Sequence, residues 1–330
     1  MRNKAERCIA IILVILLIMA QGTSMASSDP YEAYDHYSMV IAHLYGQGTP
    51  QEESLQRYAA LVDRETNGHV QVTVISRKED ASSETLMREL LQGEIQGMRG
   101  NKLEYVWQFQ ILTLPFLTNS GADIARLLDS DIAERLCLEA GEATGTAILS
   151  VGHGGYLQLF GNTREVYADD LEGMTMEYAG MRTSMTTVEA LGGTAVRTDR
   201  IQTLSFDGAL ISCEDALNMD KVPGYAVDLN IQFQPDPFIV NLGWYQRLPQ
   251  EFQRILKQCA EECDRQNVSA VEEFRNTAME ELQKRGCTVV SPLEEEAEEC
   301  RDACLYVYQW IVNEGMTSEE EVSELKGFFR

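Results

Sequence analysis

Histidine is scarce in this chain, which contains four among 330 residues. None of the four belongs to an H-E-x-x-H pattern, and no G-x-S-x-G sequence indicates a nucleophile elbow. Acidic residues are so frequent that a pair of carboxylates spaced as in a glycosidase has no diagnostic value. The sequence therefore predicts a protein that is not an enzyme and holds neither a cofactor nor a metal.

Basic residues are also under-represented, with 27 lysines and arginines against 52 aspartates and glutamates, a formal net charge of −25. Nucleic acid and anionic membrane surfaces would repel such a protein, so neither is expected as a partner. The chain has no internal repeat, no low-complexity tract and no linker rich in proline and serine. An apolar content of 44% and this length suit two globular α/β domains that exchange strands.

Long hydrophobic runs are absent except for one, from Cys8 to Ala20, which follows three basic residues. The run is shorter than the roughly 20 residues that span a bilayer, and a stretch of small and polar residues ending at Ala26 follows it. This order is typical of a signal peptide, predicted over residues 1–26, with a retained anchor helix as the alternative. The protein is expected to be exported to the periplasm or the extracellular space, with association with the cell surface left open.

Four of the cysteines form two C-x-x-x-C pairs on predicted helices, Cys259 with Cys263 and Cys300 with Cys304. Residues four apart lie on one helix face, so two antiparallel helices could be joined by disulfides Cys259–Cys304 and Cys263–Cys300. An exported protein allows such bonds. Free buried thiols and a four-thiolate zinc site are the alternatives, and zinc is not expected because its ligands usually lie on loops.

The N-terminal part alternates between strand and helix patterns. Residues 37–44 read as a buried strand and residues 69–76 as a strand with alternating side chains, and Thr49-Pro-Gln-Glu52 reads as a capping box that starts a helix. A second helix is predicted over about 83–93. This order predicts a layered α/β domain with parallel strand pairing. The elements expected further along are helices over 120–143, 181–191, 249–285 and 292–312 and strands over 147–151 and 287–290.

Several motifs resemble, in their order, the solute receptors of tripartite ATP-independent periplasmic (TRAP) transporters. The turn from Asp170 to Glu177 is similar to the family's D-L-x-G-x-x-x-R, and Leu114-Pro-Phe-Leu117 matches its L-P-F-L. Phe160-Gly-Asn162 and the helix start at Leu248-Pro249 follow the same pattern, and the resemblance covers residues 37–312. It implies a periplasmic-binding-protein-like fold with crossing strands and a long interdomain helix.

The resemblance also implies a domain organisation. Residues 27–150 and 151–248 would form two lobes that close over a solute by hinge motion, and residues 249–330 would pack back on both. Such a receptor delivers its solute to the membrane subunits of the transporter. A secreted sensory or interaction module on the same scaffold is the alternative function.

The sequence departs from the family where its arginines bind a carboxylate. Glu177 stands at the first arginine position, Gln158 at the second, and Asp215 replaces the usual asparagine. A carboxylate ligand facing Glu177 would meet like-charge repulsion in a desolvated site. We therefore expect a neutral or cationic solute, paired with Glu177, Glu214 or Asp215.

Two alternatives to this unusual site remain open. An arginine elsewhere could bind a carboxylate, with Arg99, Arg182 and Arg197 as candidates, or solute binding could be lost. Glu177 itself could instead be an exposed carboxylate at a strand end. Aromatic residues predicted to wall the cleft complete the ligand-binding set: Tyr45, Tyr105, Trp107 and Tyr156.

Overall fold

The structure is a computed structural model that describes residues 29–100, 106–118, 120–167, 170–198 and 201–329. Its contacts separate residues 1–35 from a second unit, His36–Arg330, and the description below concerns that second unit. The predicted signal peptide and Tyr105 lie outside the described residues. Within the described ranges, no helix is both long enough and apolar enough to cross a membrane.

The described strands form one sheet with the spatial order β2-β1-β3-β9-β4-β7-β5-β6, and β8 and β10 branch from β4. The strands are β1 (Tyr37–His43), β2 (Val70–Ser76), β3 (Gly97–Arg99), β4 (Thr146–Gly161), β5 (Thr175–Tyr178), β6 (Thr194–Arg197), β7 (Gly208–Ser212), β8 (Tyr225–Val227), β9 (Gln232–Asn241) and β10 (Thr288–Val290). Strand β1 runs parallel to β2 and β3, and β5 runs parallel to β6 and β7. The predicted parallel pairing is therefore confirmed.

Strands β4 and β9 are antiparallel and join the two parallel groups. The sequence predicted a strand over 147–151, but β4 continues to Gly161 and is 16 residues long. The prediction stopped early because Gly152, Gly154 and Gly155 interrupt the pattern of branched apolar residues. These two strands carry the chain from one group of strands to the other, as the resemblance implied.

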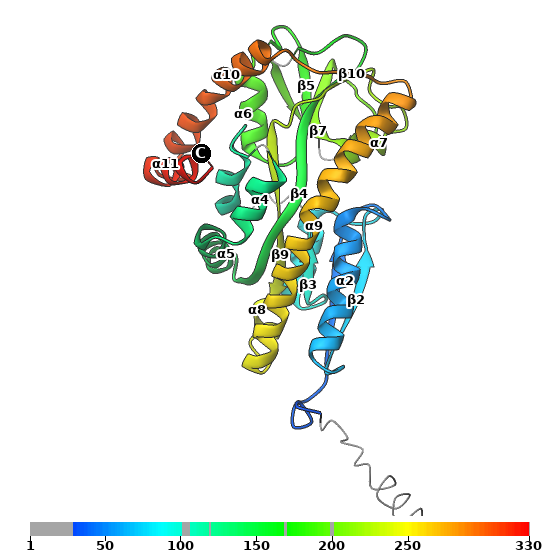
Figure 1. The fold of residues 1–330 in the computed structure, drawn as a ribbon, viewed down its shortest axis with the longest axis vertical. Helices are drawn as coiled ribbons and strands as arrows, with labels where there is room; N and C mark the ends of the chain where they lie inside the picture. The colour runs from blue at the N-terminus through cyan, green and yellow to red at the C-terminus, as the bar shows by residue number, and fades with distance from the viewer. Residues whose placement is uncertain (1–28, 101–105, 119, 168–169, 199–200, 330) are drawn as a thin grey trace, which may run out of the picture. The chain divides into compact units, whose positions relative to one another are not determined.

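The helices cover both sides of this sheet. They are α2 (Pro50–Glu65), α3 (Ser83–Gln92), α4 (Gly121–Leu128), α5 (Asp131–Thr144), α6 (Arg182–Ala190), α7 (Cys213–Leu217), α8 (Leu242–Tyr245), α9 (Gln250–Lys284), α10 (Glu294–Asn313) and α11 (Glu319–Phe328), with a 3₁₀ helix η1 (Trp107–Thr113). The 35-residue α9 runs beside β4 and also contacts α2, α4 and α7 (Figure 1). One helix therefore touches elements from both ends of the sheet.

Local capping chemistry explains where the helices begin. The Thr49 hydroxyl accepts from the backbone N–H of Glu52 and caps α2, which is half of the predicted capping box. The other half does not form, because the Glu52 carboxylate accepts from the N–H of Gly48 and the Thr49 N–H donates to the Gly46 carbonyl. The single helix predicted over 120–143 is wrong, because Ser130 caps a new helix by accepting from the N–H of Ala133. Helix α11 was not predicted, although Ser318 and Glu321 form a capping box at its start.

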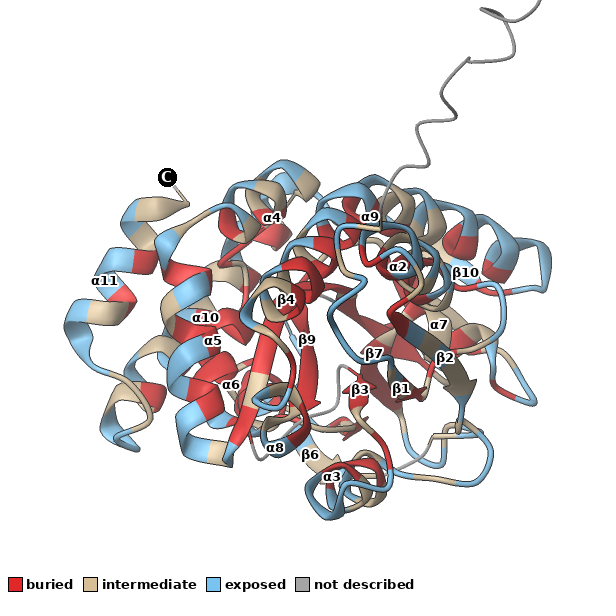
Figure 2. Cartoon of the chain, turned by 90° about the horizontal axis from the view of Figure 1, so that it is seen from below, coloured by how far each residue is buried: buried red, intermediate tan, exposed pale blue. Residues whose placement is uncertain are grey.

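The central strands are the most buried part of the unit (Figure 2). Each of the ten residues of β9 except the last is buried, and β4 is buried along almost its whole length. Strands covered on both faces need side chains that suit a dry interior. The buried polar residues of β4 and β9 are therefore the candidates for a functional site.

The predicted disulfides are wrong. The seven cysteines of the described residues are free thiols and all are buried. Cys300 and Cys304 belong to a hydrophobic cluster with Leu157 and Met176, and α10 packs on α6. The other pair lies on α9, which packs against α2, so the two pairs face different neighbours. The C-x-x-x-C spacing correctly predicted that the two cysteines of each pair share a helix face. It did not predict which helices those faces pack against.

Candidate functional site

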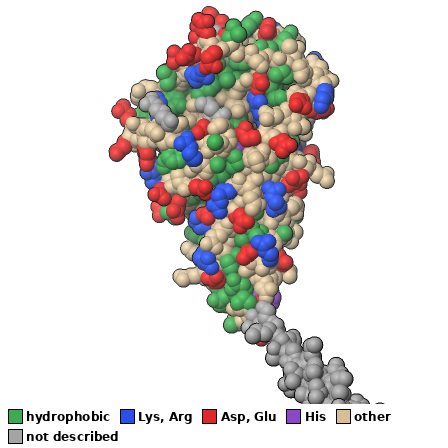
Figure 3. Space-filling view, viewed as in Figure 1, with side chains coloured by type: hydrophobic (Ala, Val, Ile, Leu, Met, Phe, Trp, Pro, Cys, Tyr) green, Lys and Arg blue, Asp and Glu red, His purple; other side chains and the backbone are tan. Residues whose placement is uncertain are grey.

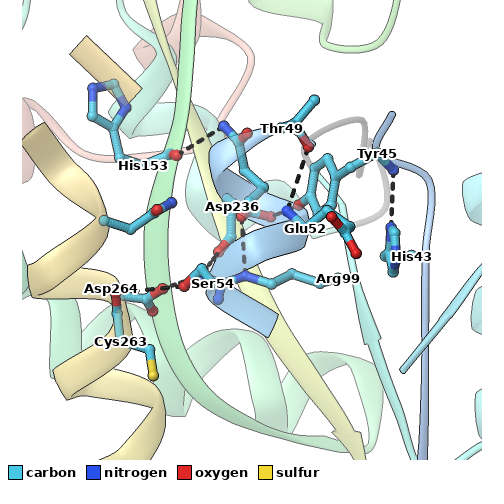
Figure 4. Close-up of polar contacts among 12 residues, drawn as sticks. His43, Tyr45, Thr49, Glu52, Ser54, Arg99, His153, Asp236, Cys263 and Asp264 are labelled. Carbon is cyan, nitrogen blue, oxygen red and sulfur yellow. Dashed lines mark hydrogen bonds and ion pairs between the residues drawn. The ribbon is translucent and has the colours of Figure 1, made fainter. Parts of the chain in front are cut away.

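A buried charge cluster lies where β3 and β9 approach α9. Arg99 ends β3, and its Nε lies 3.0 Å from Oδ2 of Asp236 on β9. Its Nη2 pairs with Oδ1 of Asp264 on α9 and donates to the backbone carbonyl of Asp236 at 3.2 Å. The Tyr45 hydroxyl donates to Oδ1 of Asp236 (Figure 4). We call Tyr45, Arg99, Asp236 and Asp264 the Arg99 cluster.

Burial and pairing together set the protonation of the Arg99 cluster. Burial disfavours the charged guanidinium, but the carboxylates of Asp236 and Asp264 outweigh it and raise the pKa of Arg99. Burial raises the pKa of Asp236, and the Arg99 charge offsets only part of this rise. Burial likewise raises the pKa of Tyr45, with a smaller contribution from the Asp236 charge. Arg99 is therefore a cation already shared by two carboxylates.

Glycine is required where the backbone passes the Arg99 cluster. A Cβ added to Gly152 of β4 would overlap Nη2 of Arg99 and lie 2.7 Å from Oδ1 of Asp264. Only a residue without a side chain allows β4 and this ion pair to approach so closely. The strand that joins the two groups of strands is thus fitted directly against the cluster.

Glu214 connects two segments that lie far apart in the sequence. Its Oε1 accepts from the backbone N–H of Gly46 at 3.1 Å and from Nζ of Lys78 at 3.0 Å. Gly46 and Lys78 follow β1 and β2, whereas Glu214 lies on α7. We call this contact the Glu214 clasp. It places Glu214 next to Tyr45 and the Arg99 cluster.

Glu177 is buried on β5, with 2% of its surface exposed. Its Oε1 accepts from the Thr198 hydroxyl at 3.3 Å and its Oε2 from the backbone N–H of Ser205 at 3.0 Å. The alternative of an exposed strand-end carboxylate is therefore wrong. Glu177 is an interior carboxylate held by two neutral donors.

Gln158 is fully buried on β4 and faces the guanidinium of Arg275, which was not among the predicted site residues. With its amide oxygen turned toward Arg275 of α9, Gln158 accepts from Nε and Nη2 at 2.8 and 2.6 Å. Arg275 in turn pairs with Asp228. Burial raises the pKa of the adjacent Cys213 thiol to about 12, so this thiol stays protonated at neutral pH.

His153 lies where β4 is irregular. The pairing of β4 with β9 shifts register between His153 and Tyr156, and Gly155 adopts a φ of 102° that favours glycine. His153 Nδ1 accepts from the N–H of Gly155 at 3.1 Å, so its Nε2 carries the proton toward Glu272 at 3.0 Å. Burial lowers the pKa of His153 more than the Glu272 carboxylate raises it. A neutral imidazole thus stabilises the bulge.

The remaining predicted residues occupy ordinary positions. Asp215 accepts from the Ser212 hydroxyl at 2.9 Å within the first turn of α7. Trp107 begins η1 and is 47% exposed, whereas Tyr156 is buried against His153 and Phe233. The structure therefore brings Tyr45, Arg99 and Glu214 together. It shows no contact of Glu177 or Trp107 with that group among the described residues.

Sequence reasoning missed the partners of these residues. Asp236 stands between two prolines in a strand that also carries two glutamines and an asparagine, and Asp264 follows Cys263 on α9 with charged residues on either side. A carboxylate inside an apolar run indicates a buried counter-ion, but neither residue stands in such a run. Arg275 and Glu272 gave no such signal, because both lie among other charged residues of a long helix.

The comparisons with known proteins decide the family. Residues 41–314 match the model of bacterial extracellular solute-binding protein family 7, also called DctP. The chain belongs to this family. The expectation that this solute-binding protein is not an enzyme is thereby confirmed. No curated protein matches the chain.

Solved structures share the fold along most of the chain. A TRAP periplasmic solute-binding protein from Ochrobactrum anthropi is 22% identical, with a TM-score of 0.77 over 89% of this chain and 95% of that one. One from Desulfovibrio salexigens with bound orotic acid is 18% identical, with a TM-score of 0.80 over 89% and 98%. One from Shewanella oneidensis with bound succinate is 17% identical, with a TM-score of 0.79 over 89% and 100%. The predicted two-domain α/β fold is confirmed.

Proposed function

We propose that this family-7 protein is the exported receptor of a TRAP-type importer and takes a neutral or cationic solute. Family membership and the shared fold support the receptor role and an extracytoplasmic location. The lobes would comprise residues 27–150 and 151–248, closing at the bulge of β4. The Glu214 clasp would then join the first lobe, through Gly46 and Lys78, to the second.

The observation that carries the charge preference is the pairing of two of the three candidate arginines, Arg99 and Arg182. Arg99 is held by Asp236 and Asp264, and Arg182 lies 2.6 Å from Glu314 on the surface. A guanidinium that already has carboxylate partners gains little from a further anion and would have to give one up. The solved relatives with orotic acid and succinate hold anions, so this receptor would differ from them in ligand charge.

Glu177 would supply the charge that selects the solute. An ionised carboxylate accepts up to about four hydrogen bonds, and Thr198 and Ser205 provide two. An ammonium or hydroxyl group of the solute would complete the set. Asp215, Gln158, Tyr156 and Trp107 would add polar and aromatic contacts around it.

A thermal-shift panel tests the proposal with three kinds of compound: dicarboxylates and sugar acids, polyols, and small amines. A ligand present at 100 times its dissociation constant stabilises the folded state by about 2.7 kcal/mol. We expect a polyol or an amine to raise the melting temperature and succinate to leave it unchanged. A large shift with succinate alone would refute the charge preference while leaving the receptor role intact.

Two variants test the role of Glu177. Glu177→Gln keeps the shape and should weaken an amine ligand at least tenfold. Glu177→Arg should shift preference toward carboxylates, and it is informative only if circular dichroism shows a folded protein. If neither variant changes the ligand profile, Glu177 does not contact the solute.

A further inference from the structure

A cavity of about 250 Å³ lies beside the Arg99 cluster, between α5, β4 and α9. Its apolar lining includes Leu128, Ile148 and Leu138, and Leu138 is 64% exposed at the surface of α5. Asp264 lines the same cavity, so one residue belongs both to the cavity and to the cluster. This volume is below the usual range for drug-sized ligands, and it suits a molecule of a few heavy atoms.

Two buried polar atoms in the lining have no hydrogen-bond partner among the described residues. They are Oδ2 of Asp264 and the hydroxyl of Ser150, in residues that are only 2% and 7% exposed. Buried polar groups are nearly always paired, and leaving a carboxylate oxygen without a donor is costly. Oδ1 of Asp264 already bonds Arg99, so only Oδ2 is open to a donor.

The charged residues that line the cavity indicate whether a cationic, a neutral or an anionic ligand would supply the donor to Asp264. Five carboxylates line it against two basic residues. Both bases are engaged, Arg265 with Asp129 at 3.3 Å and Lys257 with Glu261. The Arg99 cluster adds no spare cation, because two carboxylates share one guanidinium. Acidic and basic side chains are also interspersed on the face seen in Figure 3, so no basic patch attracts anions there. The cavity therefore favours a cation over a neutral donor or an anion.

We propose that this cavity binds a small primary amine as its ammonium ion. An ammonium group has three donors, enough for Oδ2 of Asp264, the Ser150 hydroxyl and one water. A short alkyl chain on the amine would pack on Leu128 and Ile148 and end near Leu138. This site is separate from the proposed solute site at Glu177, and it stands whether or not the charge preference of that site is correct.

Butylamine is the probe, with butanol and butyrate as matched compounds of the same length. Titration at pH 7, followed by chemical shifts of the protein or by calorimetry, should give a dissociation constant on the order of 1 mM for butylamine, within the limit set by its few heavy atoms. Butanol and butyrate should bind at least tenfold more weakly. Equal binding of butylamine and butanol would overturn the proposal.

Variants of Leu138 test the location at the surface of α5 without disturbing the Arg99 cluster. Leu138→Lys places a cation at the exposed side of the cavity and should weaken butylamine at least tenfold, whereas Leu138→Gln should change it less than threefold. Ser150→Ala removes one acceptor and should weaken binding severalfold. Asp264→Asn should abolish it, and the Leu138 pair keeps the test decisive if that variant does not fold.

A control separates this cavity from the solute site. Glu177→Gln should leave the butylamine titration unchanged, because Glu177 does not line the cavity. Butylamine binding that is lost in Glu177→Gln and kept in Leu138→Lys would assign the amine to the solute site and overturn the proposal.

Discussion

Removing the guanidinium of Arg99 should destabilise the protein strongly. In Arg99→Met, the carboxylates of Asp236 and Asp264 stay buried, with side-chain exposures of 2% and 3%, and lose their shared cation. Breaking a buried ion pair by removing one partner costs about 3–5 kcal/mol, because an uncompensated charge remains in a dry interior. That loss is a large share of the roughly 5–15 kcal/mol that stabilises a typical domain.

A compensating variant separates the charge effect from simple loss of packing. In Arg99→Met with Asp236→Asn and Asp264→Asn, no charge remains in the cluster, and the unfolding free energy should return to within about 2 kcal/mol of the wild type. Arg182→Met is the matched control. The pair that Arg182 forms with Glu314 is half exposed, so its loss should cost less than about 1 kcal/mol.

Urea unfolding, followed by circular dichroism, measures these free energies from the midpoint and slope. The reasoning fails if Arg99→Met loses less than about 1 kcal/mol, or if the triple variant is no more stable than the single one. Solute titration on the same proteins adds a second readout. If Arg99 binds a carboxylate ligand, as the open alternative holds, Arg99→Lys should change ligand affinity far more than stability.

The remaining predictions concern the clasp, the bulge and a helix cap. Glu214→Gln and Lys78→Met should each weaken the clasp, with a coupling energy of about 0.5–1 kcal/mol in a double-mutant cycle, and zero coupling in urea unfolding would exclude a direct pair. The lowered pKa of His153 means that the unfolded chain binds a proton that the folded protein does not, so unfolding free energy should fall as pH drops below about 6.5, by at most about 1.4 kcal/mol per pH unit. His153→Gln should flatten this slope between pH 7.5 and 5.5, and an unchanged slope would assign it to other groups. Thr49→Ala should cost about 1 kcal/mol through loss of the cap on α2, with no effect on butylamine binding.

Local patterns were enough to predict most helices and the parallel strands, because their signals lie within a few residues. The cap at Thr49 and the strand at Tyr37–His43 needed no tertiary information. The long strand β4 was underestimated because its glycines serve a tertiary purpose, the approach of Gly152 to Arg99. The cysteine pairs failed for a similar reason: a helical pattern shows which residues share a face and not which helix that face meets.

The sequence predicted several residues of the candidate site but not the residues with which they pair. The sequence identified Tyr45, Arg99 and Glu214 as site residues, and the structure places them around one buried cluster. The carboxylate partners of Arg99, on β9 and α9, are 137 and 165 residues away along the chain. No local pattern specifies such a pairing. From the sequence, Arg99 could therefore be interpreted as an unpaired arginine that binds a ligand carboxylate.

Glu177 is an acid at a position where the family has an arginine, and its effect on the ligand depends on whether other arginines are already paired. An acid at the position of a family arginine would matter little if another arginine stood free to bind the same anion. Arg99 and Arg182 are instead engaged with carboxylates, and Arg275 is held by Asp228 and Gln158. An anionic solute that binds to one of these three would therefore have to compete with the carboxylate that the arginine already contacts, at a cost that is highest for the buried Arg99. A solute with donors to offer meets no such competition, and this difference is what the ligand panel measures.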